Sequence, residues 1–198
     1  MDNQLGCLGN MEYSLNGEFL KYRDLVKNSM FKGRISFLVS NPGLAETKLE
    51  HGVNPCCWGT TAYLLDANQK VKDVCVGNSL SLDNYCDAMG DYVVIPDNDK
   101  PGYIGRQHME LFLDSLPRCD AEKDAVVAFF WQNMNNEFCG FGLHHSAIYL
   151  GDYGDKRIMF HQKEIGQRFQ FISIEDFIKD LSEESQRTLD VRFYYTSH

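Results

Sequence analysis

The sequence lacks several features that would place it in a special class of protein. No apolar run approaches the roughly 18 residues that a membrane-spanning helix requires. The first ten residues contain neither a basic stretch nor an apolar segment, so they do not indicate a Sec-type signal peptide. Unless a signal was removed beforehand, we expect the chain to be cytoplasmic, or exported by a route without a Sec signal peptide.

Positive charge is also scarce, and it forms no run along the chain. Nineteen Lys and Arg stand against 28 Asp and Glu, which gives a net charge of −9. Such an acidic chain is poorly suited to bind phosphate backbones or anionic membranes, so we expect no nucleic-acid or membrane partner. No internal repeat or low-complexity linker interrupts the 198 residues. Their ordinary composition predicts a single folded domain over residues 1–198.

No two cysteines have the C-x-x-C spacing, so the sequence gives little support to a zinc site. The cysteine count is odd, which leaves at least one thiol free unless it pairs with another chain. We expect most of these thiols to be reduced and buried. The seven cysteines are Cys7, Cys56, Cys57, Cys75, Cys86, Cys119 and Cys139.

Hydrophobic periodicity divides the chain into a helical front part and a strand-rich back part. Steps of three and four between apolar residues predict helices over 15–30 and 107–116, and a further helix is expected to begin near Pro55. The stretch 34–39 has the pattern of a short strand. Further strands are predicted at 92–95, 125–131, 145–150, 157–161, 169–174 and 191–196, with a helix over 174–181. This order predicts an α+β fold with a mostly antiparallel sheet.

Cys57 is the candidate nucleophile. With Asn54 as N-cap and Pro55 at the first helical position, Cys57 lies in the first turn of its helix. Unpartnered N–H groups and the helix dipole favour a thiolate there, and the thiolate is the reactive form. The alternative is a buried structural cysteine, which most cysteines are. Cys56 is the rival nucleophile, but it would lie about 100° round the helix and face elsewhere.

Two histidines are predicted to meet across a hairpin. If the turn between strands 145–150 and 157–161 centres on Tyr153, His145 stands directly opposite His161 and shares its face. His161 could then orient one ring nitrogen of His145, leaving the other to accept the proton of Cys57. The alternative is a pair of structural histidines. A register change of one residue would place the two rings on opposite faces of the sheet.

The neighbours of His145 extend this hypothesis. Ala147 shares its face, and a small residue there is expected to let the Cys57 helix pack close to the strand. The opposite face is expected to be plain core, formed by Ile148, Leu150, Ile158 and Phe160. His144 and His51 are interpreted as surface or supporting residues.

These residues resemble the NlpC-type peptidases, which have a papain-like fold. Residues 54–59, Asn-Pro-Cys-Cys-Trp-Gly, resemble the nucleophile helix of that family with its Cys-x-Gly pattern. Residues 145–151 closely resemble its histidine strand, while 124–130 and 159–161 resemble the strands before and after it. The usual Asp before the cysteine is absent, and Lys123 replaces a usual Gly. The resemblance covers about 54–178, and residues 1–50 form an N-terminal extension.

The resemblance implies a nucleophile helix packed on the antiparallel sheet and a cysteine peptidase or amidase. Its catalytic residues would be Cys57, His145 and His161, with Asn54 and Trp58 assigned to oxyanion or substrate binding. The substrate would be a peptide or another amide, foremost bacterial cell-wall peptide, and no cofactor or metal is required. Two alternatives stay open. One is the same chemistry as a deamidase, acyltransferase or toxin on another target, and the other is an inactive binding module.

Overall fold

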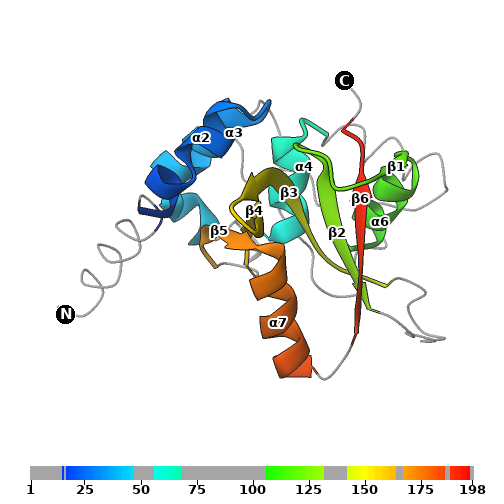
Figure 1. The fold of residues 1–198 in the computed structure, drawn as a ribbon. Helices are drawn as coiled ribbons and strands as arrows, with labels where there is room; N and C mark the ends of the chain where they lie inside the picture. Colours follow the sequence, from blue (N-terminus) through cyan, green and yellow to red (C-terminus); the bar gives the residue numbers. More distant parts are fainter. Residues whose placement is uncertain are drawn as a thin grey trace, which may run out of the picture.

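The computed structural model describes residues 15, 17–46, 56–67, 106–131, 142–163, 167–185 and 188–196. Within these ranges the chain is an α+β fold (Figure 1). The helices are α2 (Arg23–Lys27), α3 (Lys32–Ser40), the 3-10 helix η1 (Pro42–Glu46), α4 (Cys57–Leu64), α6 (Arg106–Asp114) and α7 (Ile174–Ser185). The strands are β1 (Arg118–Cys119), β2 (Val126–Trp131), β3 (Leu143–Tyr153), β4 (Lys156–Gln162), β5 (Phe169–Ser173) and β6 (Leu189–Tyr194).

The strands form a six-stranded antiparallel sheet in the order β1-β6-β2-β3-β4-β5. The hairpin β3–β4 continues into β5, so three consecutive strands lie side by side. The chain then crosses the sheet through α7, and β6 pairs with β2 on the other side. This confirms the predicted α+β class and the mostly antiparallel sheet, and it places the long strand β3 near the centre.

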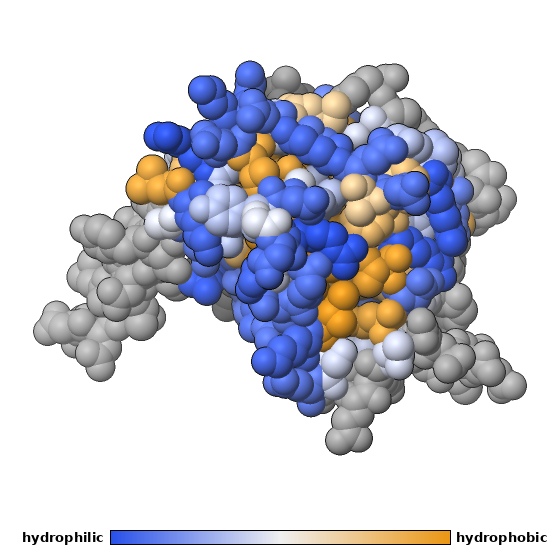
Figure 2. Space-filling view, in the orientation of Figure 1, coloured by the Kyte–Doolittle hydropathy of each residue, from blue (hydrophilic) through white to orange (hydrophobic). Residues whose placement is uncertain are grey.

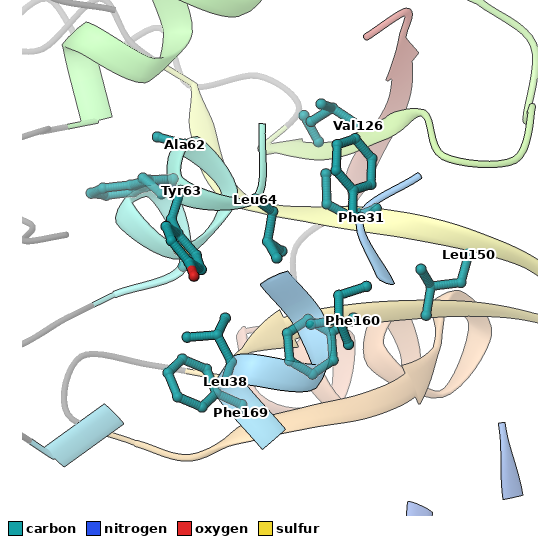
Figure 3. Close-up of a cluster of buried hydrophobic side chains, with 14 of the residues drawn as sticks. Phe31, Leu38, Ala62, Tyr63, Leu64, Val126, Leu150, Phe160 and Phe169 are labelled. Carbon is teal, nitrogen blue, oxygen red and sulfur yellow. The ribbon is translucent and has the colours of Figure 1, made fainter. Parts of the chain in front are cut away.

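Helices cover the two faces of the sheet unequally. On one face, α2, α4 and α6 contact β3, and α4 also contacts β4. The larger core cluster lies on this face, where Leu38 of α3 and Leu64 of α4 lie beside Phe160 and Phe169 of the strands (Figure 3). On the other face α7 packs against β4 and β5. The helix that carries Cys57 is therefore held against the histidine-bearing strands by a continuous hydrophobic core.

The second face carries a smaller cluster that α7 covers incompletely. Its fully buried members include Phe129 and Met159, while Trp131, Ile178 and Val191 are only partly buried. Figure 2 shows hydrophilic residues along α7 and a group of apolar residues at the surface between α7 and β6. The two histidines of the candidate site lie within this second layer, as described below.

The predicted strand over 34–39 is wrong, because these residues belong to helix α3. Ile35, Leu38 and Val39 are buried at spacings of three and four, which is the helical period, while Phe37 between them is 37% exposed. Packing of this one face against the core outweighs the strand preference of its β-branched residues.

Other predicted elements are confirmed or lie outside the described residues. Helix α6 matches the prediction for 107–116, with Met109 and Leu113 fully buried. In the first helical segment Leu15, Tyr22 and Val26 are buried as its periodicity requires, but α2 ends before Met30. The predicted strand 92–95 lies outside the described residues. Among the helices that the structure describes, none is both long and apolar enough to cross a membrane.

Candidate active site

Cys57 is the first residue of helix α4, and Cys56 is its N-cap. The predicted start at Pro55 with an Asn54 cap is therefore wrong by two residues, although Asn54 and Pro55 themselves lie outside the described residues. Cys56 has an extended backbone, with φ −138° and ψ 179°. The helical spacing of 100° consequently does not apply to the two thiols, and the Cys56 side chain hydrogen-bonds that of Cys57 instead of facing away.

The surroundings of the Cys57 sulfur favour its thiolate. The residue is only 7% exposed, and burial by itself raises the pKa of a thiol. Hydrogen bonds from Cys56 and His145, the charge of His145, and the backbone N–H of Ser146 outweigh burial and hold the pKa of Cys57 well below its usual value. The first turn of a helix adds partial positive charge at the same place. Cys57 therefore has the electrostatic environment of a nucleophile.

The two histidines share a face of the sheet, but their register differs from the predicted one. The structure pairs Tyr149 with Met159 and Ile148 with Phe160, so His161 lies one position further along, opposite Ala147 and not opposite His145. The direct pairing of the histidines is thus wrong by two residues. Because side chains alternate along a strand, a shift of two keeps both rings on one face, in diagonal positions.

A β-bulge makes this alignment possible. Next to the turn, Asp152 pairs with Arg157, and continuing that register unchanged would place Ile148 opposite His161. The two histidines would then lie on opposite faces. The register instead shifts between Tyr149 and Gly151, and Gly151 has φ +116°, a conformation that residues with a Cβ rarely adopt. One extra residue in β3 therefore brings both rings to the same side.

The rings are joined by a short hydrogen bond inside the protein. The Nε2 atom of His145 lies 2.7 Å from Nδ1 of His161, and the two residues are 3% and 1% exposed. Cys57 hydrogen-bonds the His145 side chain, and because Nε2 of His145 is already engaged by His161, Nδ1 is the nitrogen left for that bond. The structure therefore brings together the three residues predicted to be catalytic, Cys57, His145 and His161.

Gln170 extends this chain of hydrogen bonds and was missed by the sequence analysis. It lies directly opposite His161 in the β4–β5 pairing, and its Nε2 is 2.8 Å from Nε2 of His161. The burial of His161, then the charges of His145 and Lys163, lower the pKa of His161 well below its usual value. His161 is therefore neutral near pH 7. Pairing the predicted strand 169–174 with 157–161 could have pointed to Gln170. The sequence of the connection 163–168, however, does not determine the register between these two strands.

Phenyl rings enclose the histidine pair on the α7 side. The Phe177 centroid lies 4.6 Å from that of His145 and 5.3 Å from that of His161. Phe129 of β2 approaches the His145 ring at 6.0 Å. These apolar groups keep water from the histidine–histidine hydrogen bond and so strengthen it.

Buried polar contacts fix α4 against the strands. The Thr61 hydroxyl accepts a hydrogen bond from Ser146 of β3 at 3.0 Å, and the Thr60 hydroxyl donates to Gln162 of β4 at 2.8 Å. Helix α4 thus packs on the face that carries Ser146, whereas Ala147 belongs to the cluster on the other face. The expectation that Ala147 makes room for the Cys57 helix is wrong for this reason.

The remaining predicted residues lie as follows. Trp58 is 5% exposed and packs in the larger core cluster, and its role in substrate binding stays a prediction. His144 is partly buried, with its ring 4.5 Å from that of Trp131. Of the cysteines that the structure describes, Cys56, Cys57 and Cys119, none forms a disulfide. His51 lies outside the described residues.

Comparison of the chain with protein-family models, with curated proteins and with solved structures finds no match.

Proposed function

We propose that this chain is a cysteine hydrolase of the papain-like NlpC type that cleaves an amide bond in bacterial cell-wall peptide. The observation that carries the proposal is a series of hydrogen bonds from Cys57, at the start of α4, to His145 and on to His161. The pKa of Cys57 is lowered in this series. The resemblance of residues 54–59 and 145–151 to the NlpC family supports the substrate class. A nucleophile helix packed on an antiparallel sheet agrees with that resemblance.

The first half of the reaction transfers the acyl group to the enzyme. His145 takes the thiol proton of Cys57, and the thiolate attacks the carbonyl carbon of the scissile amide. The carbonyl π bond opens to give a tetrahedral oxyanion. His145 then gives its proton to the amide nitrogen, the C–N bond breaks, and an amine leaves behind a thioester on Cys57.

The second half releases the acid. His145 removes a proton from water as the water oxygen attacks the thioester carbonyl. Collapse of the second tetrahedral intermediate breaks the C–S bond, releases a carboxylic acid and restores the sulfur and the histidine to their starting protonation state. Throughout both halves His161 holds the ring of His145 in one orientation.

The oxyanion is proposed to bind at the N-terminus of α4. N–H groups of a first helical turn lack intrahelical acceptors, and that of Cys57 lies beside the reacting sulfur. One such donor contributes about 10²–10³ in rate. Asn54 and Trp58 are the proposed further contacts to the oxyanion or substrate.

The thiol chemistry is tested by peptide-resolved alkylation with iodoacetamide at pH 7. We expect Cys57 to react at least about tenfold faster than the free thiol of Cys119, whose pKa is raised by burial and by Glu122 and Asp120. Because Cys56 and Cys57 share a peptide, fragment spectra assign the modified sulfur. The Cys57→Ala variant should lose the fast reaction and remain folded. A Cys57 that reacts no faster than Cys119 would refute the enzymatic proposal.

The substrate is tested separately with purified muropeptides. Wild type should release a new amine and a new carboxylate, detected by product mass, while Cys57→Ala should release neither. A fast-reacting Cys57 without muropeptide turnover would move the proposal to another amide or acyl target of the same chemistry.

A further inference from the structure

The hydrogen bonds around His161 restrict where protons can lie. His161 is neutral and buried, so its ring carries one N–H and one bare nitrogen. Its Nδ1 faces Nε2 of His145 at 2.7 Å, and its Nε2 faces the Gln170 side chain at 2.8 Å. Whichever nitrogen of His161 holds the proton must donate, and the other must accept. The two hydrogen bonds therefore point in the same direction along the series.

The orientation of the Gln170 amide selects that direction. In the structure the amide nitrogen faces His161 and donates to its Nε2, so Nδ1–H of His161 donates to Nε2 of His145. The proton of neutral His145 then lies on Nδ1, the atom that faces Cys57, and His145 cannot accept the thiol proton.

Rotation of the amide by 180° reverses every bond in the series. The Gln170 carbonyl then accepts from Nε2–H of His161, and Nδ1 of His161 accepts from Nε2–H of His145. Nδ1 of His145 becomes bare and can take the proton of Cys57. The imidazolium that forms keeps an acceptor for its Nε2–H. A glutamine side chain fits both arrangements because it carries a donor and an acceptor at nearly the same place.

We propose that Gln170 is a positioning residue that selects the proton arrangement of the His145–His161 pair, so that His145 acts as a base only when the Gln170 carbonyl faces His161. This inference rests on the proposed function, because it concerns the same nucleophile. Gln170 is 7% exposed and lies directly across from His161, so both residues are held by the β4–β5 pairing.

Other groups around the rings do not supply a second acceptor for Nε2 of His161 among the described contacts. In the part of the chain that the structure describes, Cys57 at the start of α4 hydrogen-bonds His145, and the charge of Lys163 after β4 acts on His161. Helix α7 and strand β2 contribute the phenyl rings of Phe177 and Phe129. Lys163 is a cation and disfavours protonation of His161, so it cannot replace the carbonyl.

The test compares Gln170→Leu and Gln170→Glu with wild type by the pH dependence of Cys57 alkylation with iodoacetamide, from pH 4 to 10. Leu removes the acceptor, so the onset of reactivity should move to higher pH, and the rate at the wild-type midpoint should fall roughly three- to tenfold. Glu offers an acceptor in either orientation, so the onset should move to lower pH. These opposite shifts are the signature of a positioning role.

The control is Ser29→Ala, which removes a buried hydroxyl that donates a hydrogen bond to Asp124. It should lower the melting temperature and leave the alkylation profile in place. If Gln170→Leu does not fold, the direction of the Gln170→Glu shift decides the question. Profiles of Gln170→Glu and wild type that coincide, or a Glu shift to higher pH, would overturn the role of Gln170 alone. An unreactive Cys57 in wild type would overturn the proposed function and this inference together.

Long-range ¹H–¹⁵N spectra of ¹⁵N-histidine-labelled wild type give an independent readout. In the reactive protein we expect His161 to be protonated at Nε2 and bare at Nδ1. A reactive Cys57 beside a His161 protonated at Nδ1 would contradict the proposal.

Discussion

At the scale of single residues, opposing effects on one sulfur decide its chemistry. Burial of Cys57 is the largest of them and favours the neutral thiol, yet the donors around the sulfur reverse it and lower the pKa. One of these donors, the Cys56 thiol, comes from the adjacent residue. Its contribution depends on the extended N-cap conformation, because a helical Cys56 would point elsewhere. The Cys-Cys pair is thus a candidate nucleophile, Cys57, with a neighbouring donor, Cys56.

Replacing Cys56 by Ala should slow the alkylation of Cys57 without removing it. A hydrogen bond is worth about 1 kcal/mol, so the rate at a pH below the wild-type transition should fall about fivefold. Cys56→Ser keeps an O–H donor and should react nearly as wild type does. Both variants are measured with iodoacetamide and fragment spectra. If the Cys56→Ala variant were inert while the separate Cys57→Ala variant still turned over substrate, the assignment of the nucleophile would be reversed.

At the scale of elements, the hairpin β3–β4 is decisive because its bulge sets which side chains share a face. Gly151 has φ +116° at this bulge, although a Cβ there would make only ordinary contacts, the nearest being 3.6 Å from Leu25. The requirement for glycine is therefore conformational and not steric. Its neighbour in the turn, Gly154, has φ +67°, where Asn or Asp is also tolerated.

The Gly151→Ala substitution should lower the free energy of unfolding by about 1–3 kcal/mol, because the backbone strain is imposed on a residue with a Cβ. If the strand relieves this strain by losing the bulge, His145 turns away from His161 and Cys57 alkylation slows as well. The measurement is denaturant unfolding together with the alkylation rate.

Gly33→Ala is the matched control for this change. Gly33 lies within α3, and a Cβ there meets nothing within 4 Å. The same substitution should therefore stabilise the protein by about 0.5–1 kcal/mol. Equal effects at the two glycines would argue against a special role for the bulge.

At the scale of the whole molecule, the buried ring of His161 couples stability to pH. The pKa of His161 is lowered in the folded state by burial first, and an unfolded histidine titrates near 6.5. Below that pH the unfolded chain binds the extra proton more readily. The stability linked to His161 is therefore fully present above about pH 6.5 and is lost as the pH falls. Burial raises the pKa of Glu18 and Glu110, which acts in the opposite sense.

Wild type should lose about 1 kcal/mol more unfolding free energy between pH 7 and pH 5.5 than His161→Gln, which has no proton to gain at this position. Urea unfolding at a series of pH values measures the difference. Parallel curves for the two proteins would show that His161 is not buried as a neutral ring.

The sequence by itself was sufficient for features that depend on short spacings. Periodicity located α6, β2 and the strand-rich second half, and the residues around Cys57, Trp58 and Gly59 indicated the start of a helix there. It also placed both histidines on neighbouring strands. It misjudged 34–39, where burial of one face decided between helix and strand.

Only the tertiary structure determined how these parts meet. The bulge before Gly151 shifts the register of β3 against β4, and no local sequence pattern indicates such a shift. The histidines share a face as predicted only because the observed register differs from the predicted one by two residues, an even number. The donors around Cys57 and the contact of Gln170 with His161 join residues far apart in the chain. The physical reason is that local sequence sets the conformation of each element, whereas proton positions depend on distances of a few ångströms between elements packed around a common core.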